Sequence, residues 1–126
     1  MARKVLVVDD NADERQIYSA LLYYNGFDVV EASSGADALQ VARRERPDVV
    51  ITDYMMPQMS GLALCRALHG QPETRNTPIV CITAYELSLE QAMAAGCVQL
   101  WHKPVPPAKL VLGLEKLLPD TGISPL

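Results

Sequence analysis

The sequence predicts an α/β domain in which a parallel sheet of five strands has helices on both faces. Short runs rich in valine and isoleucine alternate with longer segments whose apolar residues recur at helical spacing, and this alternation occurs five times. The run of Val49, Val50 and Ile51 is continuous, which is typical of a strand buried on both faces. With 126 residues, the chain has the length of one domain that can bury a hydrophobic core.

Each strand is expected at one of the short apolar runs. The third strand begins at Val49 and stops at Asp53, where Met-Met-Pro and a Ser-Gly pair permit a turn. The other four runs are bounded in the same way by polar, glycine or proline residues. The predicted strands are residues 4–8, 27–31, 49–53, 78–83 and 98–101.

Each helix is expected where side chains that cap a helix, or residues that open one, follow a strand. The expected starts are residues 11, 33, 61, 88 and 106. Gly26 and Pro47 are expected to end the first two helices, because a proline cannot continue a helix interior. Residues 119–126 are predicted to form a frayed tail, so the domain is expected to span residues 1–118.

Composition excludes several classes of function. The net charge of −4 and the isoelectric point near 5.0 argue against a surface for direct binding of nucleic acid. No apolar stretch approaches the roughly 20 residues that span a membrane, and no signal peptide is recognisable, so no membrane partner is expected. Cys65, Cys81 and Cys97 are widely spaced and odd in number, which fits reduced thiols in the cytoplasm.

Three carboxylates are expected to meet at one edge of the predicted sheet. Asp9 and Asp10 follow the first strand and Asp53 ends the third, and parallel strands place ligand sites at their carboxyl ends. Like charges this close need a counter-ion. Because clustered carboxylate oxygens bind hard cations, the sequence predicts a Mg²⁺ site at this edge.

Two more residues complete a set suited to phosphoryl transfer. Thr83 ends the fourth strand and Lys103 follows the fifth, so both are expected at the same edge as Asp53. Asp53 would be the nucleophile, since a carboxylate can form an aspartyl phosphate. Thr83 would donate a hydrogen bond to one phosphoryl oxygen and Lys103 would pair with another. Mg²⁺ on Asp9 and Asp10 would spread the charge of the phosphoryl group.

Over essentially its whole length, the chain resembles the receiver domain of two-component response regulators. The segments that carry the resemblance are 5–10 (VLVVDD), 53–61 (DYMMPQMSG), 83–84 (TA), 94–96 (AAG) and 103–104 (KP). The resemblance implies the strand order 2-1-3-4-5 of a flavodoxin-like three-layer sandwich, which periodicity alone does not indicate.

The resemblance also implies a function and a ligand set. Asp53 would accept a phosphoryl group from a histidine kinase or a histidine phosphotransfer protein, and the domain would catalyse only its own phosphorylation and slow dephosphorylation. The main-chain oxygen of Met55 would join Asp10 and Asp53 around Mg²⁺, with Asp9 as a further ligand. The Lys103–Pro104 peptide would be cis.

The output region departs from the family pattern. Receivers usually carry Tyr or Phe three residues before the lysine, where this chain has Leu100, and Trp101 should point to the opposite face of the strand. The segment between Thr83 and Gly96 is also shorter than in the family. The resemblance implies that the surface of the fourth helix, fifth strand and fifth helix displays the phosphorylation state to a downstream protein. The expected switch and output residues are Thr83, Ala84, Leu100, Trp101 and Pro104.

Met55 and Tyr85 occupy the positions that, in receivers, flank the path of the water that hydrolyses the phosphoryl group. Neither side chain carries an acid or an amide that would orient this water. The sequence therefore predicts a long-lived phosphoryl group on Asp53.

Several alternatives stay open at this point. In a purely structural interpretation, Asp53 would only cap the turn that opens the third helix. In the same interpretation, Asp9 would cap the start of the first helix. The main rival function is a receiver-like docking or dimerisation module that is not phosphorylated, which the altered Leu100 suggests and which allows a homodimer. A flavin carrier fits poorly, because it would need a Ser/Thr/Gly-rich phosphate loop after the first strand, where this chain has Asp-Asp-Asn. A haloacid dehalogenase-type phosphatase fits poorly, because it would place D-x-D after the first strand and carry a cap domain.

Overall fold

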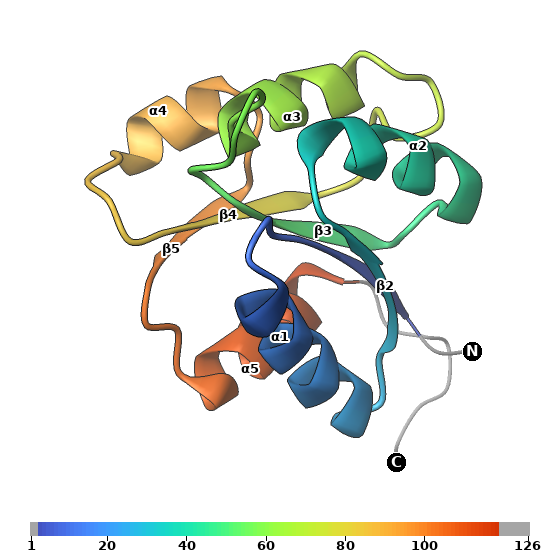
Figure 1. Cartoon of the computed structure of the whole chain (residues 1–126), viewed down its shortest axis with the longest axis vertical. Coiled ribbons are helices and arrows are strands. Elements are labelled where there is room, and N and C mark those ends of the chain that lie inside the picture. Colours follow the sequence, from blue (N-terminus) through green and yellow to red (C-terminus); the bar gives the residue numbers. More distant parts are fainter. Residues whose placement is uncertain (1–2, 119–126) are drawn as a thin grey trace.

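The computed structural model of the protein describes residues 3–118. Five strands form a parallel sheet in the order β2-β1-β3-β4-β5, and helices cover both of its faces (Figure 1). The predicted fold class and the strand order implied by the resemblance are confirmed. The predicted tail, residues 119–126, lies outside the described residues, so a domain boundary at residue 118 stays a prediction.

The elements alternate strictly along the chain. The strands are β1 Lys4–Val8, β2 Asp28–Ala32, β3 Val49–Asp53, β4 Ile79–Thr83 and β5 Gln99–His102. The helices are α1 Ala12–Tyr24, α2 Gly35–Glu45, α3 Gly61–His69, α4 Leu89–Ala94 and α5 Pro107–Leu117. Among the described residues, no helix is both long enough and apolar enough to cross a membrane.

The boundaries differ from the sequence prediction by small shifts that have local causes. Strands β2 and β5 each lie one residue later than predicted, although Phe27 is still buried in the core. Helix α2 ends at Glu45, before Pro47, because Arg46 adopts a left-handed conformation with φ of 48° and donates its N–H to the Ala42 carbonyl. Such a cap ends a helix without glycine, so the sequence carries no signal for it.

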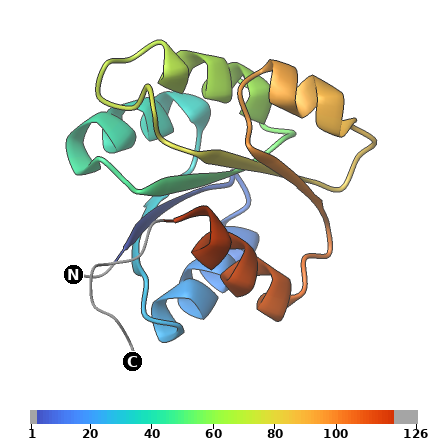
Figure 2. The ribbon, with the colours of Figure 1, turned by 180° about the vertical axis from the view of Figure 1, so that it is seen from behind.

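The two faces of the sheet pack against different helices, with α2, α3 and α4 on one side and α1 and α5 on the other (Figures 1 and 2). Alternate residues of β1 supply the two cores: Leu6 and Val8 belong to the first, Val5 and Val7 to the second. Both faces are therefore covered, which explains the continuous apolar runs in the three central strands, β1, β3 and β4.

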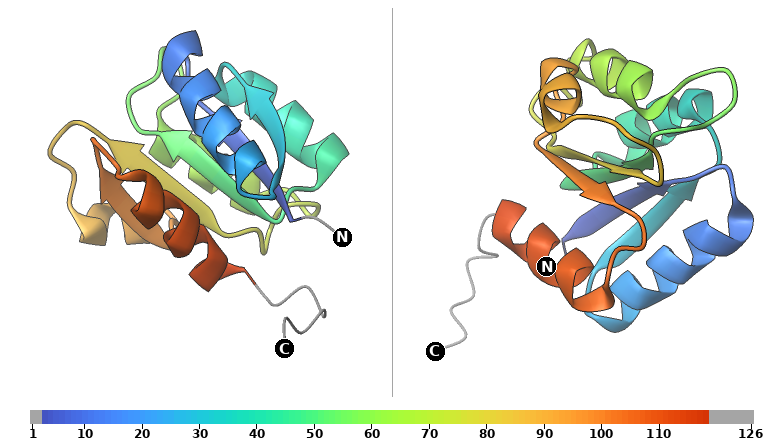
Figure 3. Two further views of the ribbon diagram at one scale, coloured as in Figure 1. Left: turned by 90° about the horizontal axis from the view of Figure 1, so that it is seen from below. Right: turned by 90° about the vertical axis from the view of Figure 1, so that its left-hand side faces the viewer.

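The residues of β5 follow the same alternation. Leu100 packs against the core on the α2–α4 side, whereas Trp101 is 5% exposed and belongs to the core under α1 and α5. The two helices lie side by side over that face in Figure 3. An added Cβ on Gly113 of α5 would lie 2.5 Å from Cζ2 of Trp101, so the missing side chain gives the indole its space. The prediction that Trp101 and Leu100 face opposite sides is confirmed.

Candidate functional site

Neighbouring strands bring the three predicted carboxylates together. β1 pairs in parallel with β3 from Val5 opposite Val49 to Val8 opposite Thr52, so both strands end at the same edge. Asp9 and Asp10 follow β1, and Asp53 is the last residue of β3. Each offers a carboxylate oxygen, and the three oxygens lie within 4.8 Å of one another. This donor set fits a hard cation such as Mg²⁺.

Burial makes this cluster electrostatically costly when every carboxyl group is ionised. Asp9 is only 2% exposed, and its Oδ1 accepts the Asn11 N–H at 2.9 Å. Desolvation raises the pKa of Asp9 from 3.8 to about 6, and the charge of Asp53 acts in the same direction. Desolvation also raises the pKa of Asp53, although Lys103 opposes the shift. Asp10 is exposed, so the cluster opens to solvent on its side.

Lys103 supplies the cation on the other side of Asp53. Its Nζ lies 3.3 Å from Asp53 Oδ1, and its backbone N–H donates to the Thr83 carbonyl at 2.8 Å. The Lys103–Pro104 peptide is cis, as the resemblance implies. Burial alone would lower the pKa of Lys103, but the hydrogen bond with Glu14 and the charges of Asp53 and Asp9 outweigh it, so the pKa is raised.

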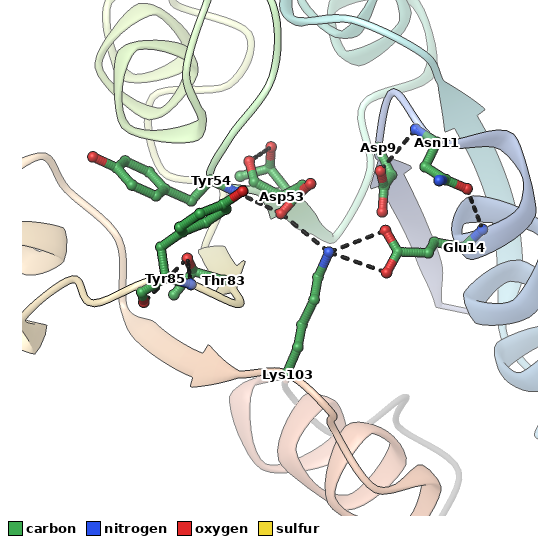
Figure 4. A network of polar contacts seen from close by, with 9 residues as sticks. Asp9, Asn11, Glu14, Asp53, Tyr54, Thr83, Tyr85 and Lys103 are labelled. Carbon is green, nitrogen blue, oxygen red and sulfur yellow. Dashed lines mark hydrogen bonds and ion pairs between the residues drawn. The ribbon is translucent and has the colours of Figure 1, made fainter.

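Thr83 lies at the end of β4, next to the end of β3. The strands stay joined there because the Tyr54 N–H donates to the Ile82 carbonyl at 2.9 Å. Thr83 is fully buried, and its Oγ1 accepts the Tyr85 N–H at 2.9 Å. Figure 4 shows Thr83, Asp53 and Lys103 close to one another at neighbouring strand ends, with the Tyr85 ring beside Thr83.

The other predicted residues lie in the loops around the site and in β5. Met55 lies in the loop between β3 and α3, two residues beyond Asp53, and its side chain is exposed. Ala84 and Pro104 are exposed in the loops that follow β4 and β5. Leu100 and Trp101 lie within β5 and point away from the edge, into the two cores.

The start of α3 packs directly on the backbone of Asp53. The Gly61 N–H donates to the Tyr54 carbonyl at 2.8 Å, and the Thr52 hydroxyl donates to the Asp53 carbonyl at 3.0 Å. A Cβ atom on Gly61 would collide with the Asp53 carbonyl oxygen. Glycine at this position therefore allows the close approach that fixes the Asp53 backbone.

One member of the site was missed by reasoning from the sequence. Glu14, in the first turn of α1, places Oε1 and Oε2 at 3.3 and 3.1 Å from Lys103 Nζ (Figure 4). The only sequence signal is its position three residues after Asn11, which is typical of a helix-capping glutamate. That pattern gives no indication that Glu14 reaches another strand end.

The fold and site together define an α/β protein whose acidic pocket suits a hard cation and, beside Lys103, an anion. The model of the response regulator receiver domain family matches residues 5–115. The polar-differentiation response regulator DivK of Brucella anthropi is 27% identical over 122 residues, which cover 95% of this chain and 99% of DivK.

Solved structures agree with this relationship. The chemotaxis protein CheY4 of Vibrio cholerae has a TM-score of 0.88 and 36% identity, and the match covers 94% of this chain and 100% of CheY4. The receiver domain of sensor histidine kinase PA1611 from Pseudomonas aeruginosa has a TM-score of 0.83 and 28% identity, covering 92% and 97%. That structure contains a magnesium ion in its active site cleft. The present chain belongs to the response regulator receiver domain family, whose members are regulatory domains of two-component signalling systems.

Proposed function

We propose that this chain is a phosphorylation-controlled receiver of a two-component phosphorelay. Asp53 accepts a phosphoryl group from the phosphohistidine of a histidine kinase or a histidine phosphotransfer protein in the cytoplasm. The observation that carries the proposal is the position of the Asp53 carboxylate. One of its oxygens lies within 4.8 Å of carboxylate oxygens of Asp9 and Asp10, and Oδ1 lies 3.3 Å from Nζ of Lys103. A nucleophile placed between an acidic cation site and an ammonium is suited to phosphoryl transfer.

The residues of the site divide the work of the transfer, and Asp53 takes part both as the nucleophile and as a ligand of the cation. An Asp53 carboxylate oxygen forms the bond to phosphorus while the bond from phosphorus to the donor breaks, and the leaving group departs with the electron pair. Lys103 pairs with one phosphoryl oxygen and the Thr83 hydroxyl hydrogen-bonds another. Asp10, Asp53, the main-chain oxygen of Met55 and Asp9 would hold Mg²⁺, which when bound neutralises developing charge on the phosphoryl oxygens.

The output would pass through the end of β4 and through β5. The Thr83 hydroxyl donates to the Tyr85 carbonyl at 3.4 Å, and it must give up this hydrogen bond when it donates to a phosphoryl oxygen instead. Such a change alters the loop that contains Ala84. Leu100 and Trp101 couple β5 to the two cores, and Pro104 follows Lys103. We infer that a downstream protein binds the surface of α4, β5 and α5 according to the state of Asp53.

The direct test is the intact mass of the protein after incubation with acetyl phosphate and Mg²⁺. Wild type is expected to gain one phosphoryl group as acetate leaves, and Asp53→Asn is expected to gain none, because its amide is not a nucleophile for phosphorus. Glu73→Gln, which changes a half-buried carboxylate in the α3–β4 loop, serves as the matched control and should behave as wild type. An adduct that persists in Asp53→Asn would contradict the assignment. A wild type without any adduct, from acetyl phosphate or a kinase, would favour the rival docking or dimerisation module that Leu100 suggests.

The phosphoryl group on Asp53 is expected to be long-lived. Met55 and Tyr85 are 50% and 58% exposed, yet neither offers an acid or amide that could orient an attacking water. The double variant Met55→Asn, Tyr85→Glu is expected to lose phosphate at least about tenfold faster, a modest part of what a positioned base contributes. The measurement is the decay of the phosphorylated mass after the donor is removed.

The matched control makes the same two changes far from the pocket. Met93 on α4 and Tyr23 near the end of α1 are similarly exposed, so Met93→Asn, Tyr23→Glu should decay like wild type. Equal decay in both double variants would refute the role assigned to Met55 and Tyr85.

A further inference from the structure

Glu14 has the position of a helix-capping residue but not its usual contact. A glutamate three residues after the N-cap commonly returns its side chain to the N-cap N–H. Here the Asn11 N–H donates to Asp9 Oδ1 at 2.9 Å, so that donor is already used. The Asn11 side chain still accepts the Glu14 N–H at 3.0 Å, which fixes the Glu14 backbone. The Glu14 carboxylate is therefore held beside the site and is left without a capping role.

This carboxylate binds Lys103 instead. Its two oxygens lie 3.1 and 3.3 Å from Nζ, while Asp53 Oδ1 lies 3.3 Å from the same atom on the other side. Figure 4 shows the ammonium between Glu14 and Asp53. Among the described residues, Lys103 supplies the one ammonium that pairs with Asp53, and this ammonium is shared between the carboxylates of Asp53 and Glu14.

We propose that Glu14 is a positioning residue that competes with the phosphoryl group on Asp53 for the ammonium of Lys103. The inference rests on the proposed phosphorylation of Asp53. A contact that is made more strongly before phosphorylation than after it stabilises the unphosphorylated state. Glu14 also places a negative charge beside the path of an anionic donor, which weakens the attraction that Lys103 exerts on it.

The competition follows from the geometry of charge around Lys103. The phosphoryl group carries roughly two negative charges near neutral pH, more than the Asp53 carboxylate that it replaces. Lys103 must turn toward these oxygens, and Glu14 and the phosphoryl group would repel each other across the same ammonium. The bidentate contact with Glu14 therefore weakens as the new contact forms.

The first experiment measures binding of trifluoroberyllate, an unreactive analogue of the phosphoryl group, by titration calorimetry in the presence of Mg²⁺. Glu14→Gln is expected to bind the analogue about two- to fivefold more tightly, the range for one partly exposed ion pair. The rate of phosphorylation by acetyl phosphate should rise by a similar factor. Asp13→Asn removes the same charge from the same helical turn, and among the described residues Asp13 makes no contact with Lys103. This control should stay at the wild-type value.

A double-mutant cycle tests whether the effect passes through Lys103. In a Lys103→Met background, Glu14→Gln should lose the greater part of its gain in analogue affinity. An undiminished gain there, an equal gain in Asp13→Asn, or no gain in Glu14→Gln would each overturn the inference. If wild type forms the adduct and binds the analogue, those outcomes leave the proposed function standing. If wild type does neither, the proposed function fails, and this inference fails with it.

Discussion

Replacing Gly61 with alanine is expected to lower the free energy of unfolding by about 2–3 kcal/mol, the range for overpacking in a rigid interior. The added Cβ would collide with the Asp53 carbonyl oxygen and lie 3.1 Å from the Tyr54 Cα. Both are backbone atoms, so no side chain can rotate away to relieve the contact. The start of α3 or the end of β3 must move, and either movement displaces Asp53. We expect urea denaturation to show the loss of stability, and intact mass to show slower phosphorylation by acetyl phosphate.

Gly70→Ala is the matched control for this prediction, because Gly70 caps the other end of α3. A Cβ atom there would lie 3.4 Å from the Ala67 carbonyl oxygen, an ordinary contact, and Gly70 has a right-handed conformation. Its stability and phosphorylation rate should stay close to those of wild type. Equal losses of stability in the two variants would show that the approach to Asp53 is not what requires glycine at residue 61.

The second large effect is expected for Asp9→Asn above pH 6. Asp9 has a pKa of about 6 in the folded protein against 3.8 ordinarily, so the folded state binds this proton more tightly than the unfolded chain does. The protonated Asp9 carboxyl group therefore stabilises the folded state fully below about pH 4. This stabilisation is lost as the pH rises through 6, which lowers the free energy of unfolding by about 3 kcal/mol. Asparagine carries no charge and can still accept the Asn11 N–H. At pH 7.5 and without Mg²⁺, the variant should therefore be the more stable protein by a similar amount.

The measurement is the free energy of unfolding of both proteins in urea from pH 4 to pH 8. The difference in the free energy of unfolding between the two proteins should increase as the pH rises. It should decrease when Mg²⁺ is added at pH 7.5, because a bound cation offsets the charge of Asp9. Asp13→Asn, in an exposed position, should follow wild type throughout. A constant difference across the pH range would show that ionised Asp9 is not destabilising.

The parts of this molecule that could be predicted from the sequence are those fixed by local patterns. The apolar run from Val49 identified β3, and the shared direction of parallel strands was enough to bring Asp9 and Asp53 to one edge. The strand order came from the resemblance, because hydrophobic periodicity records burial and not which strands are neighbours. The left-handed Arg46 had no signal, since glycine or asparagine usually marks such a cap.

Glu14 could not be predicted because its contact depends on two facts that sequence spacing does not contain. The Asn11 N–H had to be occupied by Asp9, and the side chain of Lys103 had to reach back across the sheet edge. The same asparagine-to-glutamate spacing in another helix would form an ordinary cap. The partner of the Asn11 N–H therefore decides whether the Glu14 side chain caps the helix or contacts Lys103 in the site.

The ion pair between Glu14 and Lys103 joins residues that are 89 positions apart, and Lys103 follows β5, which pairs only with β4 at the edge of the sheet. Among the described residues, the ammonium that pairs with Asp53 is that of Lys103, so this ion pair cannot form during synthesis until β5 has been made. Contacts of such long sequence separation form late, after the loops between them have closed. A nascent or truncated copy that ends before β5 would carry Asp9, Asp10 and Asp53 without their counter-charge. If Asp53 is phosphorylated as proposed, a copy that ends before β5 is therefore expected to accept the phosphoryl group more slowly than one that contains Lys103.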